Sequence, residues 1–475
     1  MGERVIRSFL AGAVGLMVFC SCAHIPKEAR LPPAVIPEAY EMRVEGRAST
    51  NYWWTSFGDT GLNAIIEEAL AGNPGLKQAA ARLEQAEALA RKAGAARIPQ
   101  VNAGGSAARG RATAFDMRGN KVSRTSNRFG LNLAASYEID LWGRVGAIER
   151  AAAIDAQASM DDLETAAMTL VARVVETWYY LASLNEQLEL LEAQIGSNEK
   201  VVHLIELRFK TGQATALDVW QQRGQLAALQ TFQPGIESML VTKRHQLAVL
   251  LGRNPQNVAD LKPASIPDLP PKPEMGVPAD LLENRPDVRS AIERVRAADE
   301  RVAAAIADRL PSLRLTASAG YSASDAADLL DDWLWNVAGN LLAPIIDGGR
   351  RRAEADRAQA VVAERLSRCG EVLLNAMREV EDALVEEQQQ VELIRRKTRQ
   401  YEIAEQTLKQ AGSRYRRGLS DYLSVLTALE SKQATARALV DARRKLVSFR
   451  IQLHRALGGN FPGLDERAEL NNGER

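Results

Sequence analysis

The sequence has little of what reactive or metal-binding sites are made from. Its 475 residues include three cysteines and four histidines. No histidine is spaced with a second histidine or a cysteine as metal sites require. Neither a Gly-x-Ser-x-Gly elbow nor a phosphate-binding loop occurs. We therefore expect no enzyme activity, no cofactor and no bound metal.

Net charge is absent as well, because 60 lysines and arginines balance 60 aspartates and glutamates. A chain with no net positive charge is not expected to bind nucleic acid. The charges are interspersed in a sequence rich in alanine, leucine and glutamine. That composition is typical of the solvated faces of long helices.

Long apolar runs are missing too. The N-terminal run over residues 9–19 is too short for a comfortable transmembrane helix and follows Arg4 and Arg7. This arrangement predicts a signal peptide over residues 1–21.

The apolar run ends in Ser21-Cys22, which looks like a bacterial lipobox. Cys22 would then be the acylated first residue of the mature chain; ordinary signal cleavage nearby is the alternative. Residues 22–50 carry four prolines and no periodicity, which predicts a lipid-anchored extended tether. Cys369 is the cysteine that remains, and its core-facing position on a helix predicts a small apolar filler.

Alternating apolar and polar residues predict two pairs of strands, each strand with one apolar and one polar face. The first pair is expected at about 100–109 and 128–139, with a polar, basic loop between its strands. The second pair is expected at about 312–322 and 333–345.

Long helical patterns surround the strands. The first is capped by Asp59 or Thr60 and pauses at Asn73-Pro74. A very long helix then reaches about Phe209, and its return over 216–251 is interrupted at Pro234-Gly235.

The second half repeats the first. Gly212 and Gly418 each end one long helix just before another begins, and they lie 206 positions apart, which predicts two equivalent helical hairpins. We expect a first repeat over 51–252, a Pro-rich segment over 253–284, a second repeat over 285–460 and a disordered tail over 461–475. The fold class is mainly α with a small β part, built from a duplicated helix, strand, strand, long helix, helix unit.

Four strands of this kind cannot stand alone in lipid, because an open sheet edge leaves backbone groups unpaired. Four are also too few to close a pore, so the pattern predicts a barrel shared between chains. A small soluble β-sandwich between helices is the alternative.

Several short motifs are spread over residues 50–460. They are Trp53-Trp54, Phe57-Gly58-Asp59, Gly61-Leu62, Asp140-Leu141-Trp142-Gly143-Arg144, Leu250-Leu251-Gly252 and the run Leu281-Leu282-Glu283-Asn284-Arg285-Pro286-Asp287-Val288-Arg289.

These motifs and the two glycine hairpins resemble the TolC family of outer-membrane efflux proteins. The similarity is to the lipoprotein (NodT-type) branch that accompanies resistance-nodulation-division pumps. The resemblance implies a homotrimer with a 12-stranded barrel in the outer membrane, continuous with a 12-helix periplasmic tunnel and a belt that includes residues 253–284. It further implies a passive exit duct for drugs, metals or other small molecules, lipid-anchored in the outer membrane and extending into the periplasm.

The same resemblance implies partners and sites. A periplasmic adaptor protein would dock at the hairpin tips, Thr211-Gly212 and Arg417-Gly418, and an inner-membrane pump would complete the system. The gate would lie just beyond these tips, where Asp218 matches a family aspartate and Asp421 is an additional acid that Arg414 could neutralise. Ser424 and Thr427 stand at positions that are often aspartate, and Ser420 stands at a position that is usually arginine.

Three alternatives remain open from the sequence. Asp218 could be an ordinary first-turn residue stabilised by the helix dipole. The conduit could serve type I protein secretion, or the chain could be a structural coiled-coil envelope lipoprotein without a transport role.

Overall fold

The computed structural model describes residues 36–41, 52–115, 117, 119, 121–257, 260, 261, 263, 265–274 and 276–458. The predicted signal peptide, the lipidation site Cys22, nearly all of the tether and the tail over 461–475 lie outside these residues.

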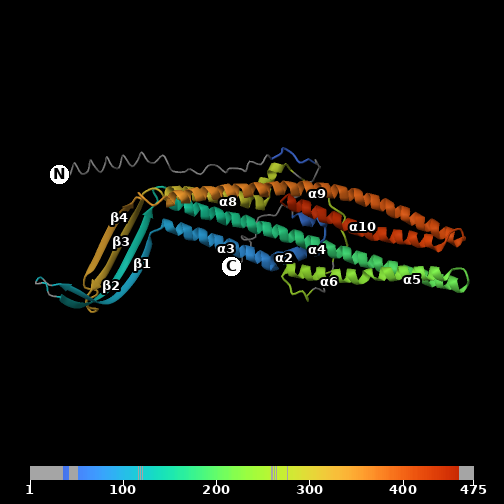
Figure 1. The fold of residues 1–475 in the computed structure, drawn as a ribbon, viewed down its shortest axis with the longest axis horizontal. Helices are drawn as coiled ribbons and strands as arrows, with labels where there is room; N and C mark the ends of the chain where they lie inside the picture. Colours follow the sequence, from blue (N-terminus) through green and yellow to red (C-terminus); the bar gives the residue numbers. More distant parts are fainter. Residues whose placement is uncertain are drawn as a thin grey trace. The chain divides into compact units, whose positions relative to one another are not determined.

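Each half of the described chain contains two strands followed by a long helix and its return (Figure 1). The elements of the first half are η2 (Trp53–Phe57), α2 (Thr60–Gly72), α3 (Pro74–Gly94), η3 (Ala95–Arg97), β1 (Gln100–Phe115), β2 (Lys121–Ile139), α4 (Arg144–Lys210), α5 (Ala216–Gln230) and α6 (Phe232–Leu251). Those of the second half are η4 (Pro278–Asp280), α7 (Leu281–Asn284), α8 (Pro286–Ala307), β3 (Ser312–Ala323), β4 (Trp333–Leu342), α9 (Arg350–Arg416) and α10 (Tyr422–Ala456).

The described residues form two compact units. Unit 1 contains residues 82–160 and 290–370, and therefore holds the sheet and the helix ends that adjoin it. Unit 2 contains the described residues within 34–81, 161–289 and 371–458, including the two helical hairpins. Within the described chain, no helix combines the length and apolarity needed to cross a membrane.

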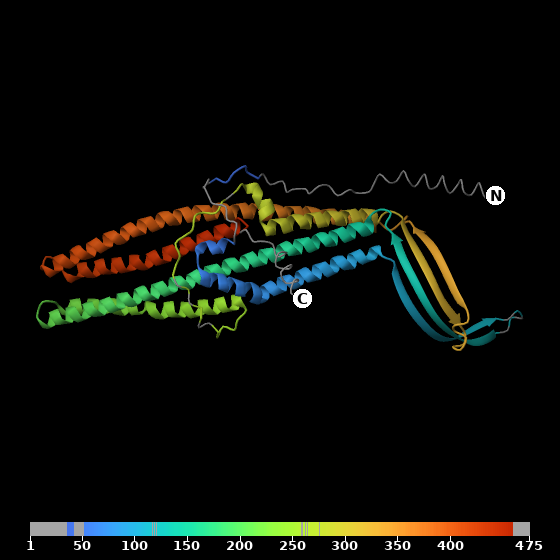
Figure 2. The same ribbon diagram turned by 180° about the vertical axis from the view of Figure 1, so that it is seen from behind.

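Unit 1 is built on an antiparallel sheet in the order β1-β2-β3-β4, and α3, α4, α8 and α9 all meet the same end of it (Figures 1 and 2). The register confirms the faces that alternation predicted, because Leu131 is opposite Tyr321 and Tyr321 is opposite Trp333. We call this side the apolar face; it carries Val101, Ala103, Ala107, Phe129, Leu131, Leu133, Ala135, Tyr137, Ile139, Leu313, Leu315, Ala317, Ala319, Tyr321, Trp333, Trp335, Val337 and Leu341.

The strand ends differ from the prediction. β1 continues past Arg109 to Phe115, and β2 begins at Lys121, so much of the predicted basic loop is a hairpin. β4 ends at Leu342 instead of continuing to 345, because Pro344 has no backbone N–H to donate to a ladder.

The junction between β2 and α4 explains the motif at 140–144. The carboxylate of Asp140 accepts hydrogen bonds from the N–H groups of Val145 and Gly146, at 3.0 and 2.7 Å. The indole of Trp142 donates to the carbonyl oxygen of Pro311 at 2.7 Å. Asp140 therefore satisfies free N–H groups at the start of α4, and Trp142 ties the junction to the residue before β3.

Unit 2 has a hydrophobic core in which Trp53, Trp54 and Phe57 pack with residues of α4 and α6. Asp59 is the predicted cap: its carboxylate accepts from the N–H of Leu62 and from the indole of Trp178, at 3.0 and 2.8 Å. The return helix breaks at Thr231, between α5 and α6, and not at Pro234-Gly235. Pro234 lies in the first turn of α6, where a missing N–H costs no helical hydrogen bond.

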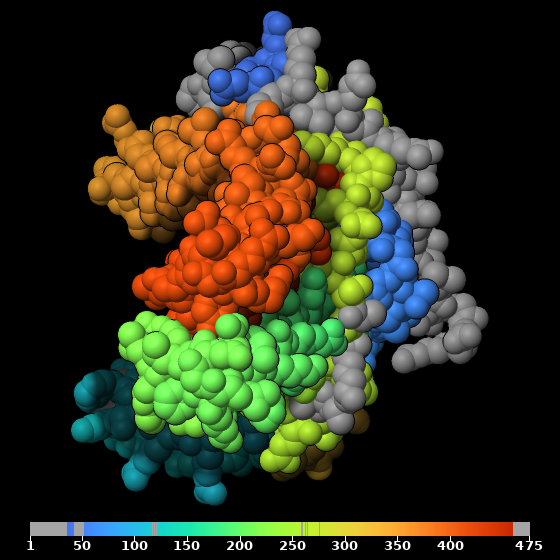
Figure 3. Space-filling model, turned by 90° about the vertical axis from the view of Figure 1, so that its right-hand side faces the viewer, coloured from blue at the N-terminus to red at the C-terminus, as the bar shows by residue number. Residues whose placement is uncertain are grey.

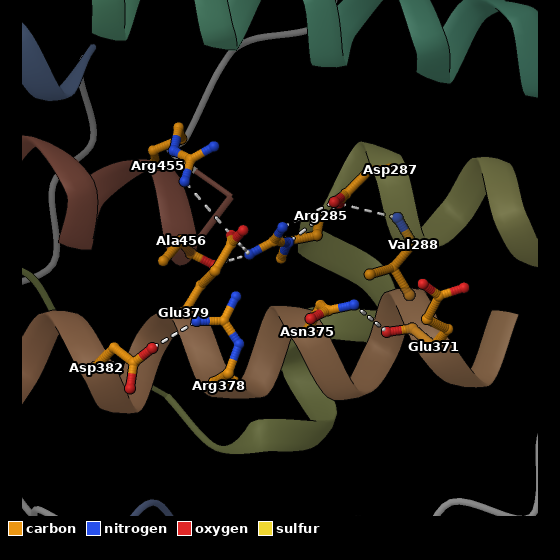
Figure 4. Close-up of polar contacts among 10 residues, drawn as sticks. All are labelled: Arg285, Asp287, Val288, Glu371, Asn375, Arg378, Glu379, Asp382, Arg455 and Ala456. Carbon is orange, nitrogen blue, oxygen red and sulfur yellow. Dashed lines mark hydrogen bonds and ion pairs between the residues drawn. The ribbon is translucent and has the colours of Figure 1, made fainter. Parts of the chain in front are cut away.

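The Arg-Pro-Asp motif is a buried anchor (Figure 4). The guanidinium of Arg285 makes two bonds to Asp287, at 3.0 and 2.7 Å, and bonds Glu379 and the carbonyl oxygen of Ala456, both at 3.0 Å. A charged group this deeply buried is stable only when its donors are satisfied. Arg285 thereby joins the start of α8 to α9 and to the end of α10.

Part of the Pro-rich segment is folded. The short elements η4 and α7 lie within the Pro-rich segment over residues 253–284. Pro270 and Pro271 precede these elements, and their carbonyl oxygens accept hydrogen bonds from the buried Arg450. Arg450 also pairs with the buried Glu387 through two 2.8 Å bonds. The segment is therefore fixed to α9 and α10.

Candidate functional site

The candidate site is the end of unit 2 where both long helices turn (Figure 3). In the first turn Gly212 has a φ of +73°, which side-chain-bearing residues rarely adopt. Its N–H donates to the carbonyl oxygen of Phe209 at 3.0 Å, and that of Gln213 donates to Arg208 at 2.8 Å. This is a Schellman end, which satisfies the last carbonyls of a helix.

The second turn repeats the first bond for bond. Gly418 has a φ of +72°. Its N–H donates to Tyr415 at 3.0 Å, and the N–H of Leu419 donates to Arg414 at 2.9 Å. Both glycines therefore end their helices as the sequence predicted, and both do so with a positive φ.

The helices that leave the turns begin with acidic caps. Thr215 and Asp218 form a reciprocal capping box: the N–H of Thr215 donates to the Asp218 carboxylate at 2.8 Å, and the N–H of Asp218 donates to the Thr215 hydroxyl at 3.2 Å. Asp421 caps α10, with the N–H and hydroxyl of Ser424 donating to it at 3.2 and 2.7 Å. Those bonds, the hydroxyl's first, lower the pKa of Asp421.

The structure brings the predicted gate residues to the same end of unit 2, but it does not pair their charges. Among the described residues of one chain, Arg414, Arg416 and Lys210 form no ion pair with either aspartate. Neutralisation of Asp218 or Asp421 by these basic residues is therefore not seen within one chain.

Sequence reasoning missed a buried polar chain behind the turns. The hydroxyl of Tyr422 on α10 donates to the Gln222 side-chain oxygen on α5, and Gln222 donates in turn to the Asn198 side chain on α4 at 2.9 Å. Gln222 and Asn198 are completely buried. These hydrogen bonds tie the two hairpins together, while Ile205 and Leu426 pack beside them.

Large apolar side chains are exposed at the turns and in the first turn of α5. Trp220, Leu217 and Leu419 are 66%, 64% and 62% exposed. Large apolar side chains that remain exposed together mark a surface for a partner.

The sheet of unit 1 has a second such surface on its apolar face. Trp333, Trp335 and Val337 of β4 are 63%, 68% and 67% exposed. The opposite face is polar: Arg144 pairs with Glu138 at 2.7 Å, and Arg314 approaches the same carboxylate at 3.6 Å. A sheet that is apolar on one face and charged on the other fits a barrel wall between lipid and water.

No group of three or more potential metal ligands exists among the described residues.

Comparisons with known proteins agree with this geometry. The family described as outer membrane efflux protein matches residues 65–253 and 277–459. The pyoverdine export outer membrane protein OpmQ of Pseudomonas aeruginosa is 31% identical over 461 residues, covering 95% of this chain and 96% of OpmQ. The toluene efflux pump outer membrane protein TtgF of Pseudomonas putida is 29% identical, covering 94% of this chain and 95% of TtgF.

Among solved structures, the outer-membrane channel OprN superimposes with a TM-score of 0.85 at 26% identity, covering 92% of this chain and 99% of OprN. The chain therefore belongs to the outer membrane efflux protein family. It is an outer-membrane efflux channel protein of the TolC-like type.

Proposed function

We propose that three copies of this chain form the outer-membrane channel of a tripartite efflux system. The observation that carries the proposal is the four-stranded sheet with two free edges and an exposed apolar face. In lipid such a sheet must close, and three copies supply twelve strands for one barrel, with their long helices forming a twelve-helix tunnel. The duct is passive and enzymatically inactive, and it passes small molecules, as the names of OpmQ and TtgF state for those proteins.

The exposed apolar side chains at the turns support the second part of the proposal. Thr211-Gly212 and Arg417-Gly418 would present this surface to a periplasmic adaptor, which would connect the channel to an inner-membrane resistance-nodulation-division pump. Acylation at Cys22 would add a lipid anchor in the outer membrane.

The gate belongs to the same proposal. Asp218, Asp421 and Ser424 begin the helices that leave the turns, so a threefold ring would bring like charges together. Arg414 would neutralise them between copies, since it does not do so within one chain. Surface ion pairs of this kind are worth about 0–1 kcal/mol each, which adaptor binding could overcome.

The test combines mass and conductance. Native mass spectrometry of detergent-solubilised protein should give three chains, and planar bilayers should show channels. Asp218→Asn with Asp421→Asn keeps a capping oxygen on each helix while removing both charges, and should raise single-channel conductance. Asp382→Asn, at an exposed acid far along α9, serves as the control. A monomeric protein, or one without channels, would refute the proposal.

A further inference from the structure

The sheet of unit 1 has two free edges, β1 and β4. Three antiparallel pairings separate them, so β1 and β4 run in opposite directions. A second copy can therefore add its β1 to β4 as one more antiparallel strand. This pairing is required by the trimeric barrel of the proposed function, on which the inference rests.

The outer ends of these edges, away from the helices, carry opposite charge. Arg109 and Arg111 lie exposed on β1 and have no acidic partner in the described part of the chain. Asp331 and Asp332 lie exposed directly before β4, again without an ion pair among the described residues. Two edges that must meet in a ring are thus electrostatically complementary.

The stagger between neighbouring strands places the arginines of one copy and the aspartates of the next at the same height along the barrel. Gln100, where β1 begins, is level with Ser136, Thr316 and Ala338 across the sheet, although β4 continues four residues further to Leu342. Strands in a barrel keep such a shear from one pair to the next. If the same stagger is kept across the junction between two copies, Ala338 of one copy lies opposite a residue of the next copy's β1. That residue is about five or six positions after Gln100.

Trp333 lies five positions before Ala338. Because the two strands are antiparallel, this alignment places Trp333 of one copy close to Arg109 and Arg111 of the next. Arg109 is opposite Asn127 and Arg111 is opposite Thr125, so both arginines share the apolar face with Phe129 and Trp333. A guanidinium beside an exposed indole gains a cation–π contact. Asp331 and Asp332 lie two and one positions before Trp333, in the connection between β3 and β4, and are therefore not bound to the alternating faces of the strand.

We infer that Arg109 and Arg111 on β1 of one copy bind Trp333, Asp331 and Asp332 of a second copy, and that these contacts select the register in which β1 pairs with β4. A shift of one residue would turn each side chain to the opposite face of the sheet. Each exposed ion pair adds little affinity and acts mainly on register and partner choice, whereas like charges placed at the same positions would repel the two edges.

A charge exchange tests the inference. Arg109→Glu with Arg111→Glu places like charges at the seam and should reduce the trimer by about tenfold or more at a fixed protein concentration. Asp331→Arg with Asp332→Arg should do the same. The chain carrying all four substitutions should recover the parental trimer fraction, measured by native mass spectrometry and by unheated gel electrophoresis.

The control variant is Arg124→Glu, because Arg124 is opposite Ala112, lies on the polar face and belongs to β2, which is neither of the two strands that would meet at the seam. It should leave the trimer unchanged. Failure of the fourfold variant to recover would overturn the inference, as would parental behaviour of both twofold variants. If the parental chain is itself not a trimer, the proposed function fails; if it is a trimer and the variants behave alike, only the inference fails.

An anionic lipid surface is the competing partner for Arg109 and Arg111. Under that explanation, the trimer of the Arg109→Glu, Arg111→Glu variant would be less stable only in vesicles containing phosphorylated glycolipid. Adding Asp331→Arg and Asp332→Arg would not restore its stability. That outcome would overturn the inference.

Cross-linking measures the register directly. Arg111→Cys combined with Trp333→Cys should give covalently linked chains on oxidation with copper phenanthroline. Gly105→Cys combined with Trp333→Cys places the cysteines level across the sheet of one copy but without the extra step of stagger, and should give little product. Equal or reversed yields would contradict the proposed register.

Discussion

His454 shows how one residue can carry a pH response far from the turns. Its ring stacks on Trp53 with centroids 5.0 Å apart, and no hydrogen-bond partner for its Nε2 atom is found among the described residues. Burial, helped by the charge of Arg450 and opposed by that of Glu387, lowers the pKa of His454 to about 4. His454 is therefore protonated at a lower pH in the folded protein than in the unfolded chain, where a histidine takes up its proton near pH 6.5.

This sets the direction of a pH effect. A lowered histidine pKa contributes stability that is present above about pH 6.5 and is lost as the pH falls toward 4, by about 3 kcal/mol in total. His454→Phe keeps the stacking and cannot titrate, so its thermal midpoint should fall less between pH 7 and pH 4.5 than that of the parent. His203→Gln, at an exposed histidine on α4, should retain the parental slope. Equal slopes for all three proteins would contradict the assignment.

The hydroxyl of Tyr422 offers a second test at the scale of single atoms. Tyr422→Phe removes the donor to Gln222 and leaves a completely buried amide oxygen unpaired, which costs about 1–3 kcal/mol. Circular dichroism should record a lower thermal midpoint.

Tyr415→Phe is the matched control in the same cluster, because the Tyr415 hydroxyl has no hydrogen-bond partner among the described residues. It should be nearly neutral. If Tyr415→Phe destabilises the protein as much as Tyr422→Phe, the polar chain does not stabilise the hairpins.

At the scale of elements, the two turns depend on backbone geometry more than on space. A Cβ on Gly418 would meet no atom within 4 Å, but the residue sits at a φ of +72°. Valine there should cost about 1–2 kcal/mol and misdirect the turn. We expect Gly418→Val to reach the outer membrane as a trimer and yet fail to restore efflux in a strain lacking its own channel.

Gly418→Asn is the comparison, because asparagine tolerates left-handed backbone, and it should restore efflux at least in part. Wild-type efflux by Gly418→Val would show that the turn is not a docking surface.

The elements also show which features a sequence can reveal. Periodicity and glycine spacing predicted α4, α9 and both turns closely, and Cys369 is buried as the helical spacing required. The hairpin formed by the outer ends of β1 and β2 was missed, because its arginines and threonines resemble a loop when hydrophobicity is the signal. Gln222 and Asn198 were missed for a related reason: a polar residue on a helix gives no sign in the sequence that it is buried with a partner.

For the whole molecule, the match between two halves of the chain extends from sequence to hydrogen bonds. The family relationship accounts for the architecture that the motifs predicted. The opposite charges at the two free sheet edges could not be assigned to a seam before the strand register was known.

The bond-for-bond likeness of the turns at Gly212 and Gly418 has a consequence for stoichiometry. A ring of three copies would present six turns of one backbone shape, but only three of each side-chain composition. A docking protein that recognises the shape would meet six equivalent places, whereas one that recognises the exposed Trp220 would meet three. Counting how many partner chains bind one ring would therefore reveal whether backbone or side chains are recognised.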